Sequence, residues 1–169
     1  MTDILQSIIK FNADKPIIDF IGFNWPYITC IITAVRLLFR YQYLIAYILF
    51  YYTNEQINKI LKIVIKQERP TNGQSFANEK YEGPHKYGFP SGHAQSIFFS
   101  LSFLYLVTNS KFLLLITGSI ATLTLYQRWN SRKHTVEQLF AGSVVGSLNG
   151  YLSYRITKHF IETKKTPIF

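Results

Sequence analysis

Five long apolar stretches constrain what this chain of 169 residues can fold into. They cover approximately residues 17–38, 41–65, 94–107, 112–126 and 136–154. Apolar runs of this length are typical of helices that are buried in a core or that cross a membrane. Each purely apolar part is shorter than the roughly 20 residues that a spanning helix needs, so polar residues at its ends have to extend it. The pattern predicts an all-α bundle.

Two features favour a membrane over a soluble core. Only 16% of the residues are charged, whereas a typical soluble domain has about 25%. Tyrosine and tryptophan also gather at the ends of the apolar runs, as they do at membrane–water interfaces. These aromatic residues are Trp25, Tyr27, Tyr41, Tyr43, Tyr51, Tyr52, Tyr126, Trp129, Tyr151 and Tyr154. A soluble bundle of buried helices is the alternative. We therefore predict an integral-membrane bundle of about five transmembrane helices, forming one domain over residues 1–169.

Residues 4–11 carry apolar side chains at close to helical spacing, with Lys10 and Lys15 nearby. This pattern predicts an N-terminal amphipathic helix that lies at the membrane interface. An ordinary surface helix would show the same spacing.

The last apolar run carries Gly142, Gly146 and Gly150 at a spacing of four. Small residues at this spacing form one helix face that allows a neighbouring helix to approach closely. We interpret these glycines as structural.

Ionisable residues lie in three clusters at the ends of the apolar runs. Lys62 and Arg69 follow the second run, His93 opens the third, and Arg128 and His134 lie between the fourth and the fifth. Charged groups at membrane depth are costly and are therefore functional candidates. In an up-and-down bundle these junctions all lie at the same end. Three cations and two histidines without a matching set of acids favour binding of a polyanion, and phosphate is the natural candidate.

The segment Pro90-Ser91-Gly92-His93 is typical of a helix start. Ser91 can cap the helix, whose free backbone N–H groups bind anions. Gly92 allows a ligand to approach the backbone, and His93 is then directed at the same anion. Each residue alone would also fit a structural role, so it is the order and spacing of the three clusters that favour an anion site.

That order is Lys-x6-Arg-Pro, Pro-Ser-Gly-His and Arg-x5-His. It resembles the three-part signature of the type 2 phosphatidic acid phosphatase superfamily, which includes the vanadium haloperoxidases. The resemblance extends over about residues 55–150, the motif-bearing core. The string His-Thr-Val-Glu-Gln at residues 134–138 is similar to the dolichyl diphosphatase branch of that family.

The resemblance implies a role for each matching residue. It implies that His134 is the nucleophile that forms a phosphohistidine and that His93 protonates the leaving oxygen. It also implies that the phosphate is held by Lys62, Arg69, Ser91, Gly92 and Arg128. Because no carboxylate cluster marks a metal site, we expect a metal-independent reaction without a cofactor, inhibited by vanadate.

Two positions depart from the family pattern. Gln127 stands where serine is usual, and Gln138 stands where aspartate usually follows the nucleophile. A glutamine amide oxygen can accept a hydrogen bond from the ring, although it supplies no negative charge. We predict that Gln138 orients His134 and marks the dolichyl diphosphatase branch. Arg132 and Lys133 are interpreted as side chains that reach out to the interface, with contact to a second phosphate as the alternative.

The resemblance and the apolar runs together favour a membrane lipid substrate. We expect hydrolysis of a polyprenyl, dolichyl-type diphosphate to the monophosphate and inorganic phosphate. Phosphatidic acid or another lipid phosphate is the second choice, and a catalytically silent phospholipid-binding relative is the third. The net charge of +9 also fits a nucleic-acid binder, but the basic residues flank apolar runs, so we expect no nucleic-acid partner.

The distribution of cations predicts which way the bundle faces. The end opposite the three clusters has Glu162 as its only acid and seven cations: Arg36, Arg40, Lys111, Arg155, Lys158, Lys164 and Lys165. An excess of lysine and arginine marks the cytoplasmic side of a membrane protein. We therefore expect a multi-pass protein whose site faces the lumen or the cell exterior.

Overall fold

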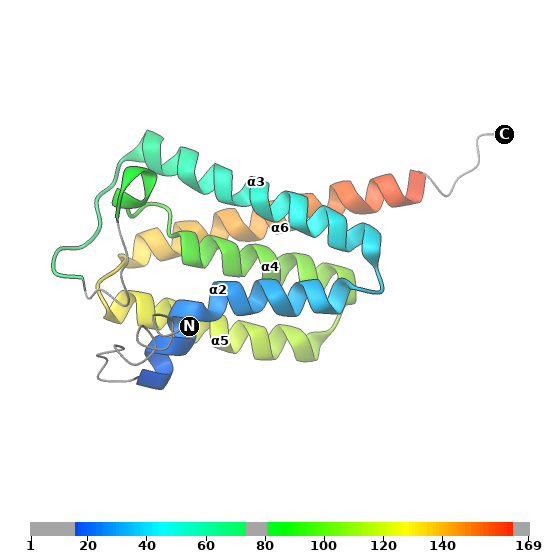
Figure 1. The fold of residues 1–169 in the computed structure, drawn as a ribbon, viewed down its shortest axis with the longest axis horizontal. Helices are drawn as coiled ribbons and strands as arrows, with labels where there is room; N and C mark the ends of the chain where they lie inside the picture. The colour runs from blue at the N-terminus through cyan, green and yellow to red at the C-terminus, as the bar shows by residue number, and fades with distance from the viewer. Residues whose placement is uncertain (1–15, 74–80, 164–169) are drawn as a thin grey trace, which may run out of the picture.

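The computed structural model describes residues 16–73 and 81–163, which form five α-helices, one short 3-10 helix and their connections (Figure 1). In chain order these are α2 (Pro16–Leu37), α3 (Tyr41–Ile65), η1 (Gly83–Lys86), α4 (Gly92–Thr108), α5 (Lys111–Asn130) and α6 (Val136–Thr163). The prediction of an all-α bundle with one helix per apolar run is confirmed. The interfacial helix predicted at residues 4–11 lies outside the described residues.

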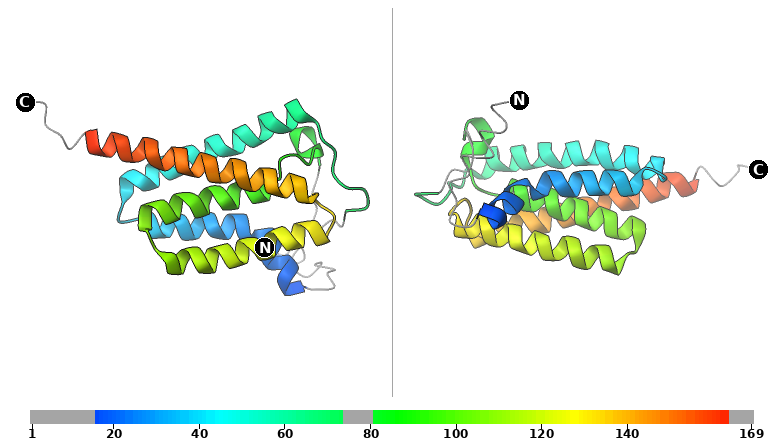
Figure 2. Two further views of the ribbon diagram at one scale, coloured as in Figure 1. Left: turned by 180° about the vertical axis from the view of Figure 1, so that it is seen from behind. Right: turned by 60° about the horizontal axis from the view of Figure 1, so that its bottom comes forward.

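Helix α4 forms the centre of the bundle. It contacts each of the other four helices, and Figures 1 and 2 show it enclosed between them. Buried residues occur on every side of it, among them Ala94, Ile97, Phe99 and Phe103, as expected for a helix that is apolar all round. Because α4 begins at the end of the bundle where α3 and α5 finish, its first turn is fixed there by the whole core.

The glycines of α6 lie against the backbone of α4. A Cβ atom added at Gly142 would lie 2.5 Å from the carbonyl oxygen of Ser91, and one at Gly150 would lie 2.6 Å from that of Phe99. A Cβ atom at Gly146 would collide with the backbone of Gln95. The predicted face of small residues is therefore confirmed. It lets α6 approach the N-terminal turn of α4, which carries the second motif.

Large apolar side chains remain exposed around the outside of the bundle, for example Phe112 at 70%, Phe140 at 69% and Ile45 at 63%. So much exposed apolar surface is typical of a face that contacts lipid or a partner. By length and hydropathy, α2 is the one described helix that qualifies as a membrane span, over Asp19–Leu37. Polar residues such as Asn54, Gln95 and Asn149, which lie inside the bundle, lower the hydropathy of the others. Five spans therefore stay a prediction.

We predict that Gly146→Ala destabilises the protein by about 1–3 kcal/mol, because the added methyl group meets backbone that side-chain rotation cannot move. Gly118→Ala is the matched control. Its Cβ would lie 3.9 Å from Leu101 Cδ1, and alanine is a better helix former than glycine by roughly 0.5–1 kcal/mol. In detergent we expect the unfolding temperature to be highest for Gly118→Ala, intermediate for the wild type and lowest for Gly146→Ala. Equal stability of Gly146→Ala and wild type would contradict the packing described here.

Candidate active site

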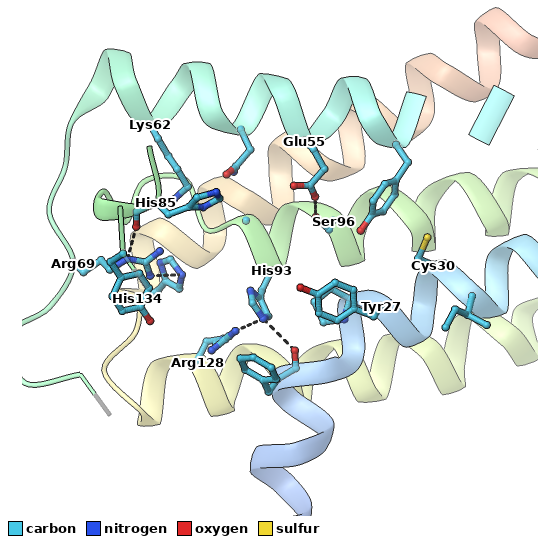
Figure 3. Close-up of a pocket in the computed structure, with 17 residues that line it drawn as sticks. Tyr27, Cys30, Glu55, Lys62, Arg69, His85, His93, Ser96, Arg128 and His134 are labelled. Atoms are coloured by element: carbon cyan, nitrogen blue, oxygen red, sulfur yellow. Dashed lines mark hydrogen bonds between the residues drawn. The ribbon is translucent and has the colours of Figure 1, made fainter. Parts of the chain in front are cut away.

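The three predicted clusters meet in one cavity at one end of the bundle (Figure 3). Its volume is about 580 Å³. Six of the predicted residues line it, namely Lys62, Arg69, Gly92, His93, Arg128 and His134. The other two, Ser91 and Gln138, are fully buried behind the wall. The expectation that the junctions converge is confirmed, although Ser91 acts in this structure as the cap of α4, where its Oγ accepts a hydrogen bond from the Ala94 N–H.

His134 lies in the turn between α5 and α6, with its two ring nitrogens in different surroundings. Nδ1 is 3.0 Å from the carbonyl oxygen of Gly88 and 3.2 Å from Oε1 of Gln138. Both partners are acceptors, which assigns the ring proton to Nδ1. Nε2 lies 3.1 Å from Arg69 Nη1, which donates. Nε2 is therefore the unprotonated ring nitrogen, as a nucleophilic imidazole requires, and its lone pair accepts a hydrogen bond from Arg69 at the wall of the cavity.

The electrostatic environment keeps this ring neutral. His134 is only 3% exposed, and burial together with the nearby cations Arg69, Lys62 and Arg128 holds its pKa well below the usual range. The hydrogen bond to Gln138 acts in the opposite direction. A neutral imidazole at physiological pH follows from these contacts.

Gln138 uses both ends of its amide group. Oε1 accepts hydrogen bonds from His134 and from the Thr135 N–H, and Nε2 donates to the carbonyl oxygen of Glu68 at 2.8 Å. A Cβ atom at Gly88 would lie 2.7 Å from Gln138 Cδ, so a larger residue there would displace the amide group of Gln138. Aspartate, the usual residue of the family, has no donor for the Glu68 carbonyl. Gln138 therefore makes a contact with the Glu68 carbonyl that aspartate could not make.

A short segment, residues 83–88, holds several of the predicted residues through its backbone, and we call it the strap. Lys62 Nζ donates to the carbonyl oxygen of Tyr87 at 2.8 Å, and Arg69 Nε donates to that of His85 at 3.2 Å. The Gly88 carbonyl accepts from His134. Three carbonyl groups of the strap thus position one residue each. Sequence reasoning missed this, because a backbone acceptor leaves no mark in the sequence.

His93 lies in the first turn of α4, across the cavity from His134. Its Nε2 contacts Nη2 of Arg128 and lies 3.2 Å from the carbonyl oxygen of Phe23 in α2. The guanidinium carbon of Arg128 is 5.4 Å from the centre of the Phe23 ring, which is within cation–π range. Helix α2, which carries no motif residue, therefore forms part of the site.

The structure gives Gln127 and Lys133 roles that the sequence did not indicate. Gln127 Nε2 donates to Asp19 Oδ1 at 3.1 Å and so connects the ends of α5 and α2. Lys133 is only 2% exposed, and its Nζ donates to Tyr81 Oη at 2.7 Å. The interpretation of Lys133 as a side chain that reaches out to the interface is therefore wrong, because a tyrosine of the polar connection covers it. Arg132 is exposed, in line with that interpretation.

A buried amide network supports the second motif from behind. Asn58 Nδ2 donates to Gln95 Oε1 at 2.8 Å and to the Pro90 carbonyl at 3.3 Å, and Gln95 Nε2 donates to Asn54. A signal for this existed, because Asn54, Asn58 and Lys62 lie four residues apart and so share one helix face. In the part of the chain that the structure describes, we find no cluster of three His, Cys, Asp or Glu side chains that would hold a metal ion.

An all-α bundle with two histidines and three cations around one cavity is the arrangement that the three-part signature describes. The model of the PAP2 superfamily matches residues 41–162. The chain therefore belongs to the PAP2 superfamily.

Curated relatives and one solved structure resemble the chain. Dolichyldiphosphatase 1 of Mus musculus is 33% identical over 132 residues, 69% of this chain and 52% of the mouse protein. Dolichyldiphosphatase of Saccharomyces cerevisiae is 32% identical over 114 residues, 61% of this chain and 47% of the yeast protein. Lipid phosphate phosphatase gamma of Arabidopsis thaliana is 30% identical over 105 residues, 56% of this chain and 44% of the plant protein. The chain thus spans about half the length of these relatives.

One solved structure that resembles the chain is a transmembrane PAP2 type phosphatidylglycerolphosphate phosphatase from Bacillus subtilis. The TM-score is 0.62 at 21% identity, and the match covers 96% of this chain and 85% of that one. This likeness supports the fold described above.

The depressed pKa of His134 predicts a pH-dependent stability. Unfolded histidine binds a proton near pH 6.5, whereas folded His134 does so only at lower pH. The unfolded state then binds more protons below about pH 6.5, so stability is lost as the pH falls. His134→Gln has no such proton, and we expect its unfolding temperature to fall less than that of the wild type between about pH 7 and 5. Parallel curves would show that His134 is not held neutral.

Proposed function

We propose that this protein is a multi-pass membrane lipid phosphatase that hydrolyses a polyprenyl, dolichyl-type diphosphate to the monophosphate and inorganic phosphate. The observation that carries the proposal is the unprotonated Nε2 of His134, which faces a cavity lined by Lys62, Arg69 and Arg128. A nucleophile surrounded by three cations suits attack on a phosphoryl group, whose negative charge those cations stabilise.

The chemistry proceeds in two balanced steps. When the phosphate binds, Arg69 Nη1 donates to a phosphate oxygen instead of to Nε2 of His134, which frees the lone pair. Nε2 then attacks the terminal phosphorus, and the bond from that phosphorus to the bridging oxygen breaks. The bridging oxygen keeps the electron pair and takes a proton from His93, which releases the lipid monophosphate and leaves a phosphohistidine. His93 then removes a proton from water, the oxygen of which attacks the phosphorus. The P–N bond breaks and its electron pair returns to Nε2 of His134, which releases inorganic phosphate.

The apolar part of the cavity supports a lipid as the leaving group. Beyond His93 the wall is formed by Phe23, Pro26, Tyr27 and Ile31 of α2 and by Tyr51 of α3. Figure 3 shows Tyr27 lying on the side of His93 away from His134. In-line attack places the leaving group on that same side. The end of a hydrocarbon chain attached to a phosphate would therefore enter this apolar part of the cavity.

The surface of the four outer helices supports the proposed bundle of about five membrane-spanning helices. Apolar residues are exposed along α3, α5 and α6 as well as α2, and each of these helices is 20 residues or longer. Arg40, Lys111 and Lys158 lie at the end opposite the cavity. The positive-inside rule then directs the cavity to the lumen or the cell exterior.

The diphosphate is preferred because several relatives are named dolichyldiphosphatases. A lipid monophosphate is the second candidate, since the plant relative is named a lipid phosphate phosphatase. A silent lipid-binding role is disfavoured, because such a role has no need of two histidines held in one cation-lined cavity.

Phosphate release by the purified protein in detergent and EDTA tests the proposal. We expect faster release from a polyprenyl diphosphate than from phosphatidic acid, inhibition by vanadate, and a loss of at least about 10³-fold in kcat for His134→Ala, which removes the nucleophile. His159→Ala, an exposed histidine near the far end of α6, is the control and should keep full activity. Release only from phosphatidic acid would move the substrate to the second candidate. Release that survives in His134→Ala would contradict the mechanism.

Gln138→Met tests the contact that orients the nucleophile. Methionine has a similar volume but accepts no hydrogen bond from the ring, so the Gly88 carbonyl is left to hold His134. We expect kcat to fall about tenfold with little change in KM, because the contact acts on the nucleophile rather than on binding. Gln42→Met, an exposed residue at the other end of the bundle, is the matched control. An unchanged kcat for Gln138→Met would show that the Gly88 carbonyl alone suffices.

A further inference from the structure

His85 is an imidazole of the cavity wall that belongs to none of the three motifs. It lies in η1 and lines the same cavity as Lys62 and Arg69. Figure 3 shows its ring beside Lys62, directed inward, on the side of the cavity away from Arg128. The residue as a whole is exposed. The ring therefore stands at the mouth of the cavity, between solvent and the cations.

The backbone fixes this position. The carbonyl oxygen of His85 accepts a hydrogen bond from Arg69 Nε, and its N–H donates to the Glu82 carbonyl at 3.1 Å. Two residues further on, the Tyr87 carbonyl accepts from Lys62 Nζ. The same strap thus holds two of the cations and the imidazole. Its geometry brings the ring beside Lys62, at the wall of the cavity that Lys62 and Arg69 also line.

The charges that face the ring come from α3 and from the connection after it. Burial and the cations Lys62, Lys59 and Arg69 lower the pKa of His85, and the carboxylate of Glu55 raises it. The ring is therefore neutral near pH 7 when the cavity is empty. A bound phosphoryl group has the opposite effect on the pKa of His85, because its negative charge stabilises the protonated ring.

We propose that His85 is an additional phosphate-binding residue at the cavity mouth, which in its protonated form donates a hydrogen bond to the phosphoryl group as it enters and to inorganic phosphate as it leaves. The proposal rests on the proposed function, because it takes the ligand to be a phosphate. Binding then takes up a proton, so affinity should rise as the pH falls. No lipid is needed to test this, since inorganic phosphate and vanadate present the same oxygens.

The experiment compares the dissociation constants of vanadate and of inorganic phosphate for the wild type and His85→Gln between about pH 5.5 and 8, the range over which histidine titrates. For each anion and each pH, the dissociation constant of His85→Gln is divided by that of the wild type. The ionisation of the anion affects both constants equally and therefore cancels in this ratio. We expect His85→Gln to bind about tenfold more weakly at the acid end, as expected for loss of one charge-assisted hydrogen bond, and nearly equally at the alkaline end. His85→Lys, which keeps a positive charge, should bind tightly throughout. His159→Gln is the matched control.

Because His85 is exposed, its variants should fold, and their unfolding temperatures check this. A ratio near one at every pH overturns the proposal, even if the protein releases phosphate from lipids. Failure of the wild type to bind either anion also overturns it. In that case phosphate release from the diphosphate by the same preparation decides separately whether the proposed function stands.

Discussion

The site depends on one physical constraint. Its cations have to be held in place at the end of an apolar bundle without losing the positive charge that attracts a ligand. A carboxylate partner would fix a lysine or an arginine but would also cancel its charge. The strap offers Lys62 and Arg69 the carbonyl oxygens of Tyr87 and His85 as hydrogen-bond acceptors. A carbonyl dipole accepts the hydrogen bond without neutralising the cation. In the proposed function the attraction for a phosphate then depends on backbone geometry, and the strap has to be held in place as firmly as the side chains.

The meeting of the motifs follows from the packing of two helices. The glycines of α6 bring its backbone against the first turns of α4. At this contact the Ser91 N–H donates to the carbonyl oxygen of Gln138 at 2.9 Å. The side chain of the same Gln138 reaches His134 and the carbonyl of Glu68. The second motif, the third motif and the connection after α3 therefore meet at one residue. A change in the spacing of α4 and α6 would displace all three together.

Periodicity and motif order predicted the parts that depend on side chains. The apolar runs located the five helices to within a few residues at most ends. Each helix extends over the apolar side chains that it has to bury in the bundle or against lipid, so the ends of a run lie close to the ends of its helix. The runs placed the end of α6 too early, at residue 154 rather than Thr163, because the last turns are polar and project beyond the bundle (Figure 1). The convergence of the three motifs could also be predicted from the sequence. In an up-and-down bundle the junctions that carry them all lie at the same end.

The remaining parts of the site depend on contacts that leave no pattern in a single sequence. The acceptors for His134, Lys62 and Arg69 include backbone carbonyls, which every residue has. The contribution of Phe23 arises because α2 packs beside α4 and α5, an arrangement that the order of the helices does not fix. Lys133 was misread because its polar neighbours indicated solvent, whereas Tyr81 from a distant part of the chain covers it. Only the spacing of Asn54, Asn58 and Lys62 contained a signal that could have been used.

The departure at Gln138 shows how such contacts can substitute for a motif residue. In a triad the aspartate orients the imidazole and stabilises its positive charge. In the proposed mechanism His134 becomes part of a phosphohistidine with three cations nearby, so the negative charge of the transferred group would lie next to the ring itself. Orientation is then the larger need, and two neutral acceptors, Gly88 and Gln138, supply it. A neutral acceptor also leaves the field of the cations undiminished before the substrate arrives. The glutamine is therefore consistent with an active site whose charge is reserved for phosphate.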